Sequence, residues 1–177
     1  MSQLKVNSIV PSGGLTSGAN GGIVQMVTSH MKTRQSISAS TSFQATGLSA
    51  TITPSSNNSK ILIVVNGIYN VYNATNTQYL TQFKLYNGTS EITDANATGA
   101  TNNSWKAMFE VSADSGDHQQ YELLPIQGDY LYTHGGSAGS AITINLYATS
   151  TVAMYFNGRY LTTHAGTSSM TLYEIGG

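Results

Sequence analysis

The chain has 177 residues, enough for one domain with a buried core and little more. It contains no cysteine, which excludes disulfides, thiolate metal sites and cysteine nucleophiles and fits assembly in a reducing cytoplasm. Only 8% of the residues are charged and the formal net charge is −1, so we expect neither nucleic-acid binding nor attraction to an anionic membrane. The polar residues are mostly neutral, with 22 Ser, 22 Thr and 14 Asn. These types favour turns and strands over helix interiors, which predicts an all-β domain.

Residues 1–22 differ in composition from the rest of the chain. A short apolar run is stopped by Pro11, and the stretch that follows holds five of the 18 glycines. A Gly/Ser-rich stretch in isolation is a flexible linker, so a disordered tail is one interpretation. No signal peptide and no membrane-inserted segment are indicated. The apolar side chains favour docking on another surface instead, and those in question are Leu4, Val6, Ile9, Val10 and Leu15. We therefore expect an N-terminal segment, 1–22, and a folded domain, 23–177.

From residue 23 onward, short runs of alternating apolar residues are separated by polar turns. The strongest run is Lys60–Tyr72, and Asn87-Gly88 predicts a hairpin turn after Tyr79–Asn87. About ten short strands at this spacing predict an antiparallel β-sandwich or jelly-roll. The other expected strands are Ile23–Thr28, Lys32–Ile37, Ser42–Leu48, Leu48–Thr53, Thr89–Thr93, Tyr121–Gln127, Ala141–Ala148, Val152–Tyr160 and Ser169–Ile175.

One stretch, Ser104–Ser112, fits two periodicities. Trp105, Met108 and Phe109 have helical spacing. The set that falls on one face of a strand is Trp105, Ala107, Phe109 and Val111. Its position among strands favours the strand. Polar loops are expected at residues 94–103, 113–118 and 135–139.

Catalytic and metal-binding patterns are weak. No Gly-x-Ser-x-Gly motif occurs, and the four histidines are scattered. Asp114-Ser115-Gly116-Asp117-His118 offers oxygen ligands for calcium but lacks the length of a calcium loop, which favours an ordinary turn. Glu110 and Glu122 are a carboxylate pair that glycoside hydrolysis would need, although each is better placed facing solvent. We expect no catalytic residues, no metal, no cofactor and no enzymatic activity.

Tyrosine accounts for eleven of the sixteen aromatic residues. Its flat apolar ring and polar tip suit both sugar stacking and subunit interfaces. Tyr130, Tyr132 and His134 precede the 135–139 loop and form the predicted receptor-binding surface, borne on a loop. The alternative is that the tyrosines fill sheet faces or line a trimer axis. Other local groups are Tyr69/Tyr72 and Tyr155/Tyr160.

Several phrases of the sequence carry a family resemblance. They are residues 4–9 (LKVNSI), 21–25 (GGIVQ), 46–56 (TGLSATITPSS), 59–63 (SKILI) and 169–177 (SMTLYEIGG). With these phrases the chain resembles tail-fibre or other virion appendage proteins of tailed phages, especially marine phages of the cyanophage type. Residues 94–139 contribute nothing to the resemblance.

The resemblance implies a virion protein, assembled in the host cytoplasm as a homotrimer. Its N-terminal segment would attach to other virion proteins through Leu4, Val6, Ile9 and Val10. Its β domain would face outward as a tail fibre and bind a host-surface glycan or protein, with avidity from many copies. One alternative is a head fibre, decoration or adaptor protein with a purely structural role. A further alternative, on weaker grounds, is a polysaccharide depolymerase.

Overall fold

The computed structural model describes residues 22–57, 59–72, 79–99, 103–110, 123–160 and 165–176. Within these ranges the one helical element is a short 3₁₀ turn, η1 (Thr93–Ala95), and no helix is long and apolar enough to cross a membrane. Apart from Gly22, the predicted N-terminal attachment segment (residues 1–22) lies outside the described residues. The strands are β1 (Ile23–Met31), β2 (Gln35–Ile37), β3 (Ser40–Ile52), β4 (Lys60–Tyr72), β5 (Tyr79–Asn87), β6 (Ser90–Glu91), β7 (Lys106–Glu110), β8 (Leu124–Thr133), β9 (Ile142–Ser150), β10 (Ala153–Phe156) and β11 (Ser168–Ile175).

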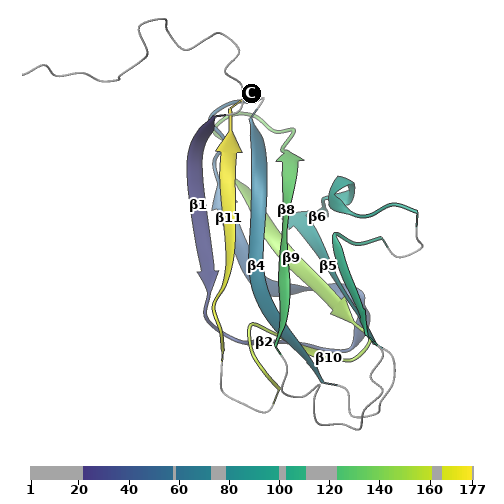
Figure 1. Ribbon diagram of the computed structural model, residues 1–177. Coiled ribbons are helices and arrows are strands. Elements are labelled where there is room, and N and C mark those ends of the chain that lie inside the picture. Colours follow the sequence, from purple (N-terminus) through teal and green to yellow (C-terminus); the bar gives the residue numbers. More distant parts are fainter. Residues whose placement is uncertain are drawn as a thin grey trace, which may run out of the picture.

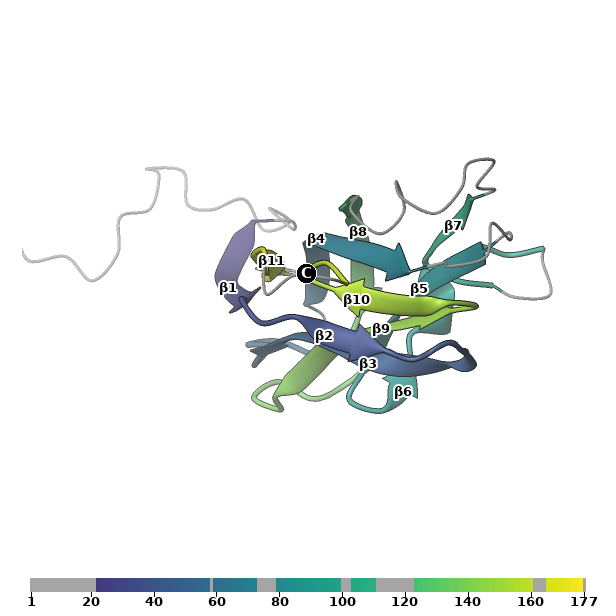
Figure 2. The same ribbon diagram turned by 90° about the horizontal axis from the view of Figure 1, so that it is seen from below.

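The strands form two antiparallel sheets that pack face to face (Figures 1 and 2). In the first sheet β1, β11, β4 and β8 lie side by side, and β10 and β2 extend it along the far part of β4. In the second sheet the order is β3, β9, β5, with β7 and β6 both paired to β5. Two four-stranded sheets, β1-β11-β4-β8 over β3-β9-β5-β7, are the arrangement of an eight-stranded jelly roll. The predicted β-sandwich or jelly-roll is confirmed.

Alternating burial explains how the sequence closes this sandwich. In β4 the side chains of Ile61, Ile63 and Val65 are fully buried, whereas Leu62 and Val64 are half-buried on the outer face. The period of two places successive side chains on opposite faces of a strand. Aromatic rings then join the two sheets: Tyr69 of β4 meets Phe83 of β5 edge-on, with 5.1 Å between ring centroids.

The predicted strands agree best where turn signals flank a long apolar run. β4 and β5 have the predicted bounds, and the predicted hairpin turn is present. Asn87 pairs with Ser90 across Gly88 and Thr89, and Gly88 takes the positive φ (60°) that favours glycine at the first position of a two-residue hairpin loop. The ambiguous stretch contains a strand, β7 (Lys106–Glu110), so the choice of strand over helix is confirmed.

Several predicted strand bounds were wrong: β2, β6 and β10 are shorter than predicted, and the two largest differences concern β3 and β8. The strands expected at Ser42–Leu48 and Leu48–Thr53 are one strand, β3, which is bulged where Gly47 takes a φ of +86° and the pairing with β9 shifts register. The strand expected at Tyr121–Gln127 is β8, Leu124–Thr133, which continues past Gln127 because it pairs along almost the whole of β4.

Both ends of the described domain meet at one end of the sandwich, which we call the entry pole. Ile23 of β1 pairs with Ile175 of β11, which pairs with Lys60 of β4, which pairs with Thr133 of β8. The Gly176 N–H also donates to the Gly22 carbonyl at 2.9 Å. At the opposite end, the far pole, β4 ends and β5 begins (Figure 1).

A buried carboxylate holds the entry pole together. Glu174 is fully buried, and its two oxygens accept hydrogen bonds from Ser55, Ser59 and Gln25 at 2.5–2.7 Å. Burial alone raises the pKa of Glu174, but these hydrogen bonds outweigh it and lower the pKa to about 2. The charged group therefore ties β1 and the loop after β3 to β11.

Candidate functional site

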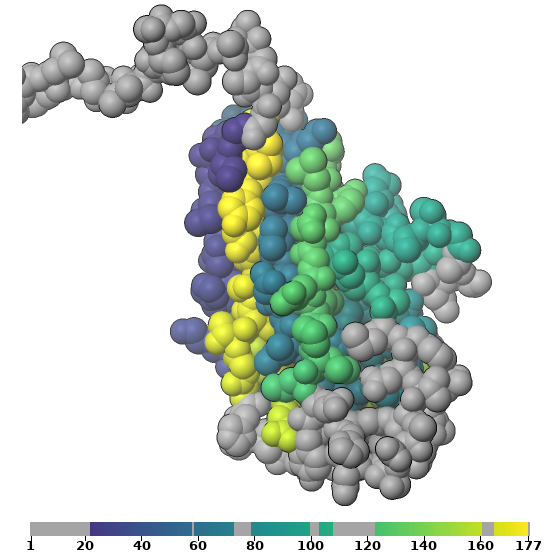
Figure 3. All heavy atoms as spheres, in the orientation of Figure 1, coloured from purple at the N-terminus to yellow at the C-terminus, as the bar shows by residue number. Residues whose placement is uncertain are grey.

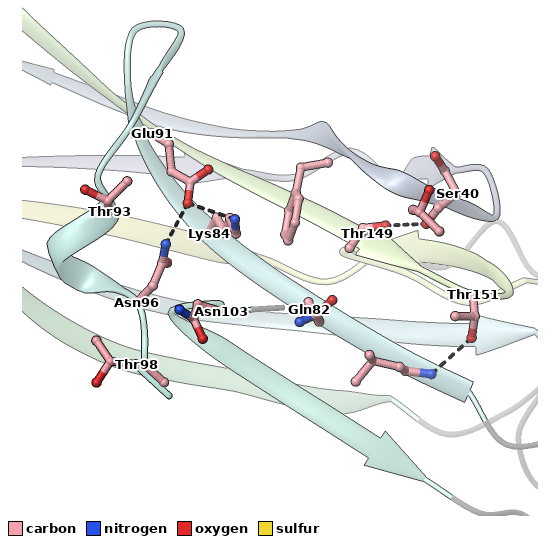
Figure 4. A pocket seen from close by; sticks show the side chains of 14 residues that line it. Ser40, Gln82, Lys84, Glu91, Thr93, Asn96, Thr98, Asn103, Thr149 and Thr151 are labelled. Carbon is pink, nitrogen blue, oxygen red and sulfur yellow. Dashed lines mark hydrogen bonds and ion pairs between the residues drawn. The ribbon is translucent and has the colours of Figure 1, made fainter. Parts of the chain in front are cut away.

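A cavity of about 470 Å³ opens on the outer face of the β3-β9-β5 sheet (Figure 4). Its volume is in the range of small-molecule binding sites. We call it the sheet pocket. Most of its lining groups are hydroxyls and amides, and the lining residues are Ser40, Thr41, Phe43, Leu80, Gln82, Lys84, Glu91, Thr93, Asn96, Ala97, Thr98, Asn103, Thr149 and Thr151.

The floor of the sheet pocket follows from strand alternation. In β5, Phe83 faces the core, so its neighbours Gln82 and Lys84 face outward into the pocket. Thr149 of β9 lies opposite Gln82, and its hydroxyl donates to the carbonyl of Ser40 in β3. Three adjacent strands thus present one polar surface.

The wall of the pocket is the segment that leaves β5 and returns to it. The chain turns through β6 and η1, and the Ala97 N–H donates to the Ser104 carbonyl at 3.0 Å. Gln82 Nε2 donates to the Ser104 hydroxyl at 3.5 Å, which joins this wall to the floor. The segment that contains β6 and η1 projects above the sheet face, and the pocket is the space between this segment and the sheet.

The charges inside the pocket cancel. Lys84 Nζ lies 2.8 Å from Glu91 Oε1 and 4.6 Å from the centre of the Phe43 ring. Asn96 Nδ2 donates to the same carboxylate oxygen at 2.6 Å, and these partners are drawn in Figure 4. Burial raises the pKa of Glu91, but hydrogen bonds from Lys84 and Asn96 outweigh it, so the pKa is lowered and the carboxylate is charged at neutral pH.

The sheet pocket lies toward the far pole. Ser40, at the start of β3, pairs with Ser150 at the end of β9, and Ser150 pairs with Thr81 near the start of β5. The pairs near the entry pole, such as Ile52 with Ile142, line no part of it. The floor of the pocket is therefore on the half of the domain away from residues 22 and 176, whereas the wall, with Glu91 beside Tyr86, extends toward the middle of the sheet.

The predicted receptor-binding residues are elsewhere, near the entry pole. Tyr130 and Tyr132 belong to β8 rather than to a loop, and both pack partly buried against the core. The Tyr132 hydroxyl accepts a hydrogen bond from Asn87 Nδ2 at 3.2 Å. His134 is 6% exposed, and its ring bonds the Ser56 carbonyl and the Gly136 N–H. Their contacts are structural, and the loop placement was wrong for Tyr130 and Tyr132, whereas His134 follows the last residue of β8. The role of the three residues in receptor binding stays a prediction.

The remaining tyrosine groups separate into core and surface. Tyr69 is buried in the core, as the sheet-filling interpretation expects. Tyr72 and Tyr160 stack at the far pole with ring centroids 3.8 Å apart, and Tyr155 lies 5.3 Å from Tyr160. Tyr72 of the first predicted group thus joins both members of the second group in one aromatic cluster.

Three sequence predictions fall on parts that the structure does not describe. They are the Asp114–His118 turn, the side chains of the Glu110/Glu122 pair, and the attachment residues Leu4, Val6, Ile9 and Val10. Among the described residues, no group of three or more His, Asp or Glu side chains is arranged to hold a metal ion.

Sequence reasoning missed the sheet pocket. Its residues come from four separated segments of the chain, and no single segment contains a recognisable motif. One local signal was present: Gln82 and Lys84 alternate with apolar residues in β5, which marks an outward polar face.

Known proteins resemble this chain only weakly. No known protein family and no curated protein matches it. Among solved structures it is similar to infectious bursal disease virus VP2 in a subviral particle, with a TM-score of 0.36 and 10% identity over 94% of this chain. A structure of the Gx strain of the same virus gives a TM-score of 0.33 and 11% identity over 98% of this chain. The chain spans 42% and 43% of those two chains. Similarity this weak establishes neither family nor function.

Proposed function

We propose that this chain is a structural protein of a virion, a tail-fibre type appendage that displays its jelly-roll domain for attachment to the host. The proposal begins from the sequence phrases that resemble tailed-phage appendage proteins. It includes attachment to other virion proteins through residues 1–22, so that the protein is located on the particle.

One geometric observation carries the proposal. The two ends of the described domain meet at the entry pole, whereas the sheet pocket lies toward the far pole. A domain held by the chain that precedes Gly22 therefore presents the floor of the pocket away from its point of attachment. This placement supports a displayed receptor site, because binding groups are commonly carried away from the point of anchorage on a rigid scaffold.

The proposed role is not enzymatic. Hydrolysis of a polysaccharide normally needs two carboxyl groups, one on each side of the scissile bond. Glu91 is the one carboxylate in the described lining of the sheet pocket, and its oxygens already bond Lys84, Asn96 and Tyr86. This arrangement favours binding over depolymerisation.

The test locates the protein and asks whether it blocks infection. Antibodies against the domain should label the tail fibres of particles that contain this chain, by electron microscopy. The purified chain, added in excess, should slow adsorption of the same particles to host cells. Labelling of the head alone, or no labelling of particles, would contradict the tail-fibre role.

A second candidate, a head fibre, decoration or adaptor subunit, is favoured by a different feature. The outer face of the β1-β11-β4-β8 sheet exposes large apolar side chains, including Ile23 (64% exposed), Met26 (59%) and Leu131 (46%). Exposed apolar faces of this kind suit contact with other subunits. In a homotrimer, the assembly that we propose, copies of the chain would cover this face.

Light scattering of the full chain separates these assemblies. A mass three times that of the 18.7 kDa chain supports the homotrimer. A monomeric chain that binds particles but does not compete for host cells supports the decoration or adaptor role.

A further inference from the structure

We propose that the sheet pocket binds a neutral saccharide. This inference rests on the proposed function, because display toward a host surface is what would bring such a ligand to the pocket. It is carried by three properties of the pocket: its hydrogen-bonding groups, its cancelled charge and its apolar surface.

The first property is the density of neutral hydrogen-bonding groups. Nine of the fourteen lining residues contribute a hydroxyl or an amide side chain, and Lys84 and Glu91 add one paired set of charges. All of these residues except Thr41 are labelled in Figure 4. Hydroxyls both donate and accept, and side-chain amides offer both functions on one plane. Sugar hydroxyls need the same mixture of donors and acceptors, whereas an apolar ligand would leave these groups without partners.

The side-chain amide of Asn96, in the wall of the pocket, is held in one orientation and has one acceptor without a partner. Its Nδ2 is fixed by the 2.6 Å hydrogen bond to Glu91, which settles the orientation of the amide. Its Oδ1 is buried and has no hydrogen-bond partner among the described residues. A buried acceptor without a partner is unfavourable, so a shift of the wall that opened Oδ1 to a ligand hydroxyl would relieve that cost.

The second property is charge. The ammonium of Lys84 is paired with Glu91 at 2.8 Å, and no other Lys, Arg, Asp or Glu belongs to the described lining. An anionic ligand would have to compete with Glu91 for Lys84 and would meet the carboxylate itself. The pocket therefore offers uronic or sialic acids no free cation, and it discriminates against them by charge rather than by shape.

The third property is an apolar surface beside the polar groups. Phe43 and Leu80 are both half-buried and both line the pocket. The C–H faces of a sugar ring are apolar while its hydroxyls are polar, so an aromatic ring among hydroxyls and amides matches both. We assign the ligand as a neutral oligosaccharide on these grounds.

The experiment uses the full chain, a printed saccharide array and two groups of probes. The neutral group contains oligosaccharides of glucose, mannose, galactose and N-acetylglucosamine, and the anionic group contains sialylated and uronic-acid oligosaccharides. We expect binding to at least one neutral probe and weaker binding to anionic ones. The affinity for the best neutral probe is then measured by calorimetry for designed variants.

The variants block the pocket without touching the core. Thr41 is exposed at one rim, and Thr41→Trp should lower affinity at least about tenfold by filling the opening. The matched control is Thr51→Trp, which changes an exposed threonine of the same strand outside the pocket and should leave affinity within about twofold. Thr93→Trp on the opposite wall is a second blocking variant, should Thr41→Trp unfold in a thermal melt.

The outcomes that would overturn saccharide binding differ from those that would overturn the virion role. Neutral binding that Thr41→Trp and Thr93→Trp both leave intact, preference for anionic probes, or no neutral binding by the arrayed protein would overturn it. Failure of the proposed function looks different: the pocket variants lose saccharide binding, yet antibodies find the chain on no particle. If particles that carry Thr41→Trp adsorb to host cells normally, the protein is still a virion component, but the saccharide bound in the sheet pocket is not its receptor.

Discussion

The outer faces of the two sheets differ, although their inner faces are built alike. Toward the core, both sheets present buried aliphatic and aromatic residues, such as Ile63 in β4 and Leu85 in β5. Outward, the β1-β11-β4-β8 sheet presents a continuous surface in which these strands lie side by side (Figure 3). The β3-β9-β5 sheet presents a hollow lined by neutral polar groups. The buried residues of both sheets stabilise the fold, and the residues at outward positions make the two outer faces different.

Register explains the apolar surface of the first sheet. Met26 pairs with Tyr173, Tyr173 with Leu62, and Leu62 with Leu131, so four non-charged side chains form one row across four strands. The next row contains Thr28 and Thr171, whose hydroxyls are 3.0 Å apart. A surface of this composition has little to bind a small polar ligand and much to bury against another subunit. We infer that assembly and ligand binding are assigned to opposite faces.

Two carboxylates, one in each sheet, allow the comparison of the two faces to be tested. Glu174 lies on the inner side of the first sheet and Glu91 on the outer side of the second. The largest effect is expected for Glu174→Gln, which should lower the free energy of unfolding by about 3 kcal/mol, because four hydrogen bonds to a buried anion are weakened or lost. Urea unfolding at pH 7 measures it. A loss below about 1 kcal/mol would show that Glu174 does not hold the entry pole.

The pH dependence of stability should report the same group. The pKa of Glu174 is about 2 in the folded chain, below its ordinary value of 4.5. A lowered folded-state pKa means that the stabilisation is complete above about pH 4.5 and is lost as the pH falls toward 2. We expect wild type to lose roughly 2–3 kcal/mol across that interval, measured from urea midpoints. Glu174→Gln should lose less over the same interval, and equal losses in both proteins would assign the acid sensitivity to other groups.

The sequence predicts the sandwich better than it predicts either outer face. β4 and β5 are found to the residue because an alternating run and an Asn-Gly turn are local signals. The sheet pocket joins residues 40–43, 80–84, 91–103 and 149–151, and only the strand order brings them together. A pocket of this kind has no local signature, so no motif search would have found it.

Some features had a local signal that was not used. In β11, Met170 and Leu172 alternate as inward residues, and Glu174 continues the same alternation. A carboxylate at an inward position must be hydrogen-bonded when buried, which marks a structural anchor. Tyr130 and Tyr132 alternate in the same way in β8, and this alternation indicates a strand rather than the predicted loop.

A charge on the apolar face should break assembly and leave the fold intact. Met26→Lys changes a side chain that is 59% exposed, so the free energy of unfolding of the single chain should change by less than about 0.5 kcal/mol. If copies of the chain cover this face, burial of the new charge should weaken association at least about tenfold. Light scattering over a concentration series measures the mass. Thr51→Lys, on the other sheet, is the control, and a Met26→Lys protein that assembles like wild type would remove this face from the interface.

The smallest expected effect belongs to Glu91→Gln, which uncovers a charge in the sheet pocket. The substitution keeps the shape of the side chain and leaves Lys84 without its carboxylate partner at 2.8 Å. Stability should fall by less than about 1 kcal/mol, because the pair is partly exposed and solvent screens it. Binding of uronic-acid oligosaccharides should rise severalfold, since Lys84 becomes available to an anion and the repelling carboxylate is gone. Calorimetry with neutral and anionic probes compares the variant with Asp129→Asn, which removes the same charge from the other sheet. If anionic binding is equal in the two variants, the selectivity of the sheet pocket does not come from the Lys84–Glu91 pair, and the two faces differ in shape alone.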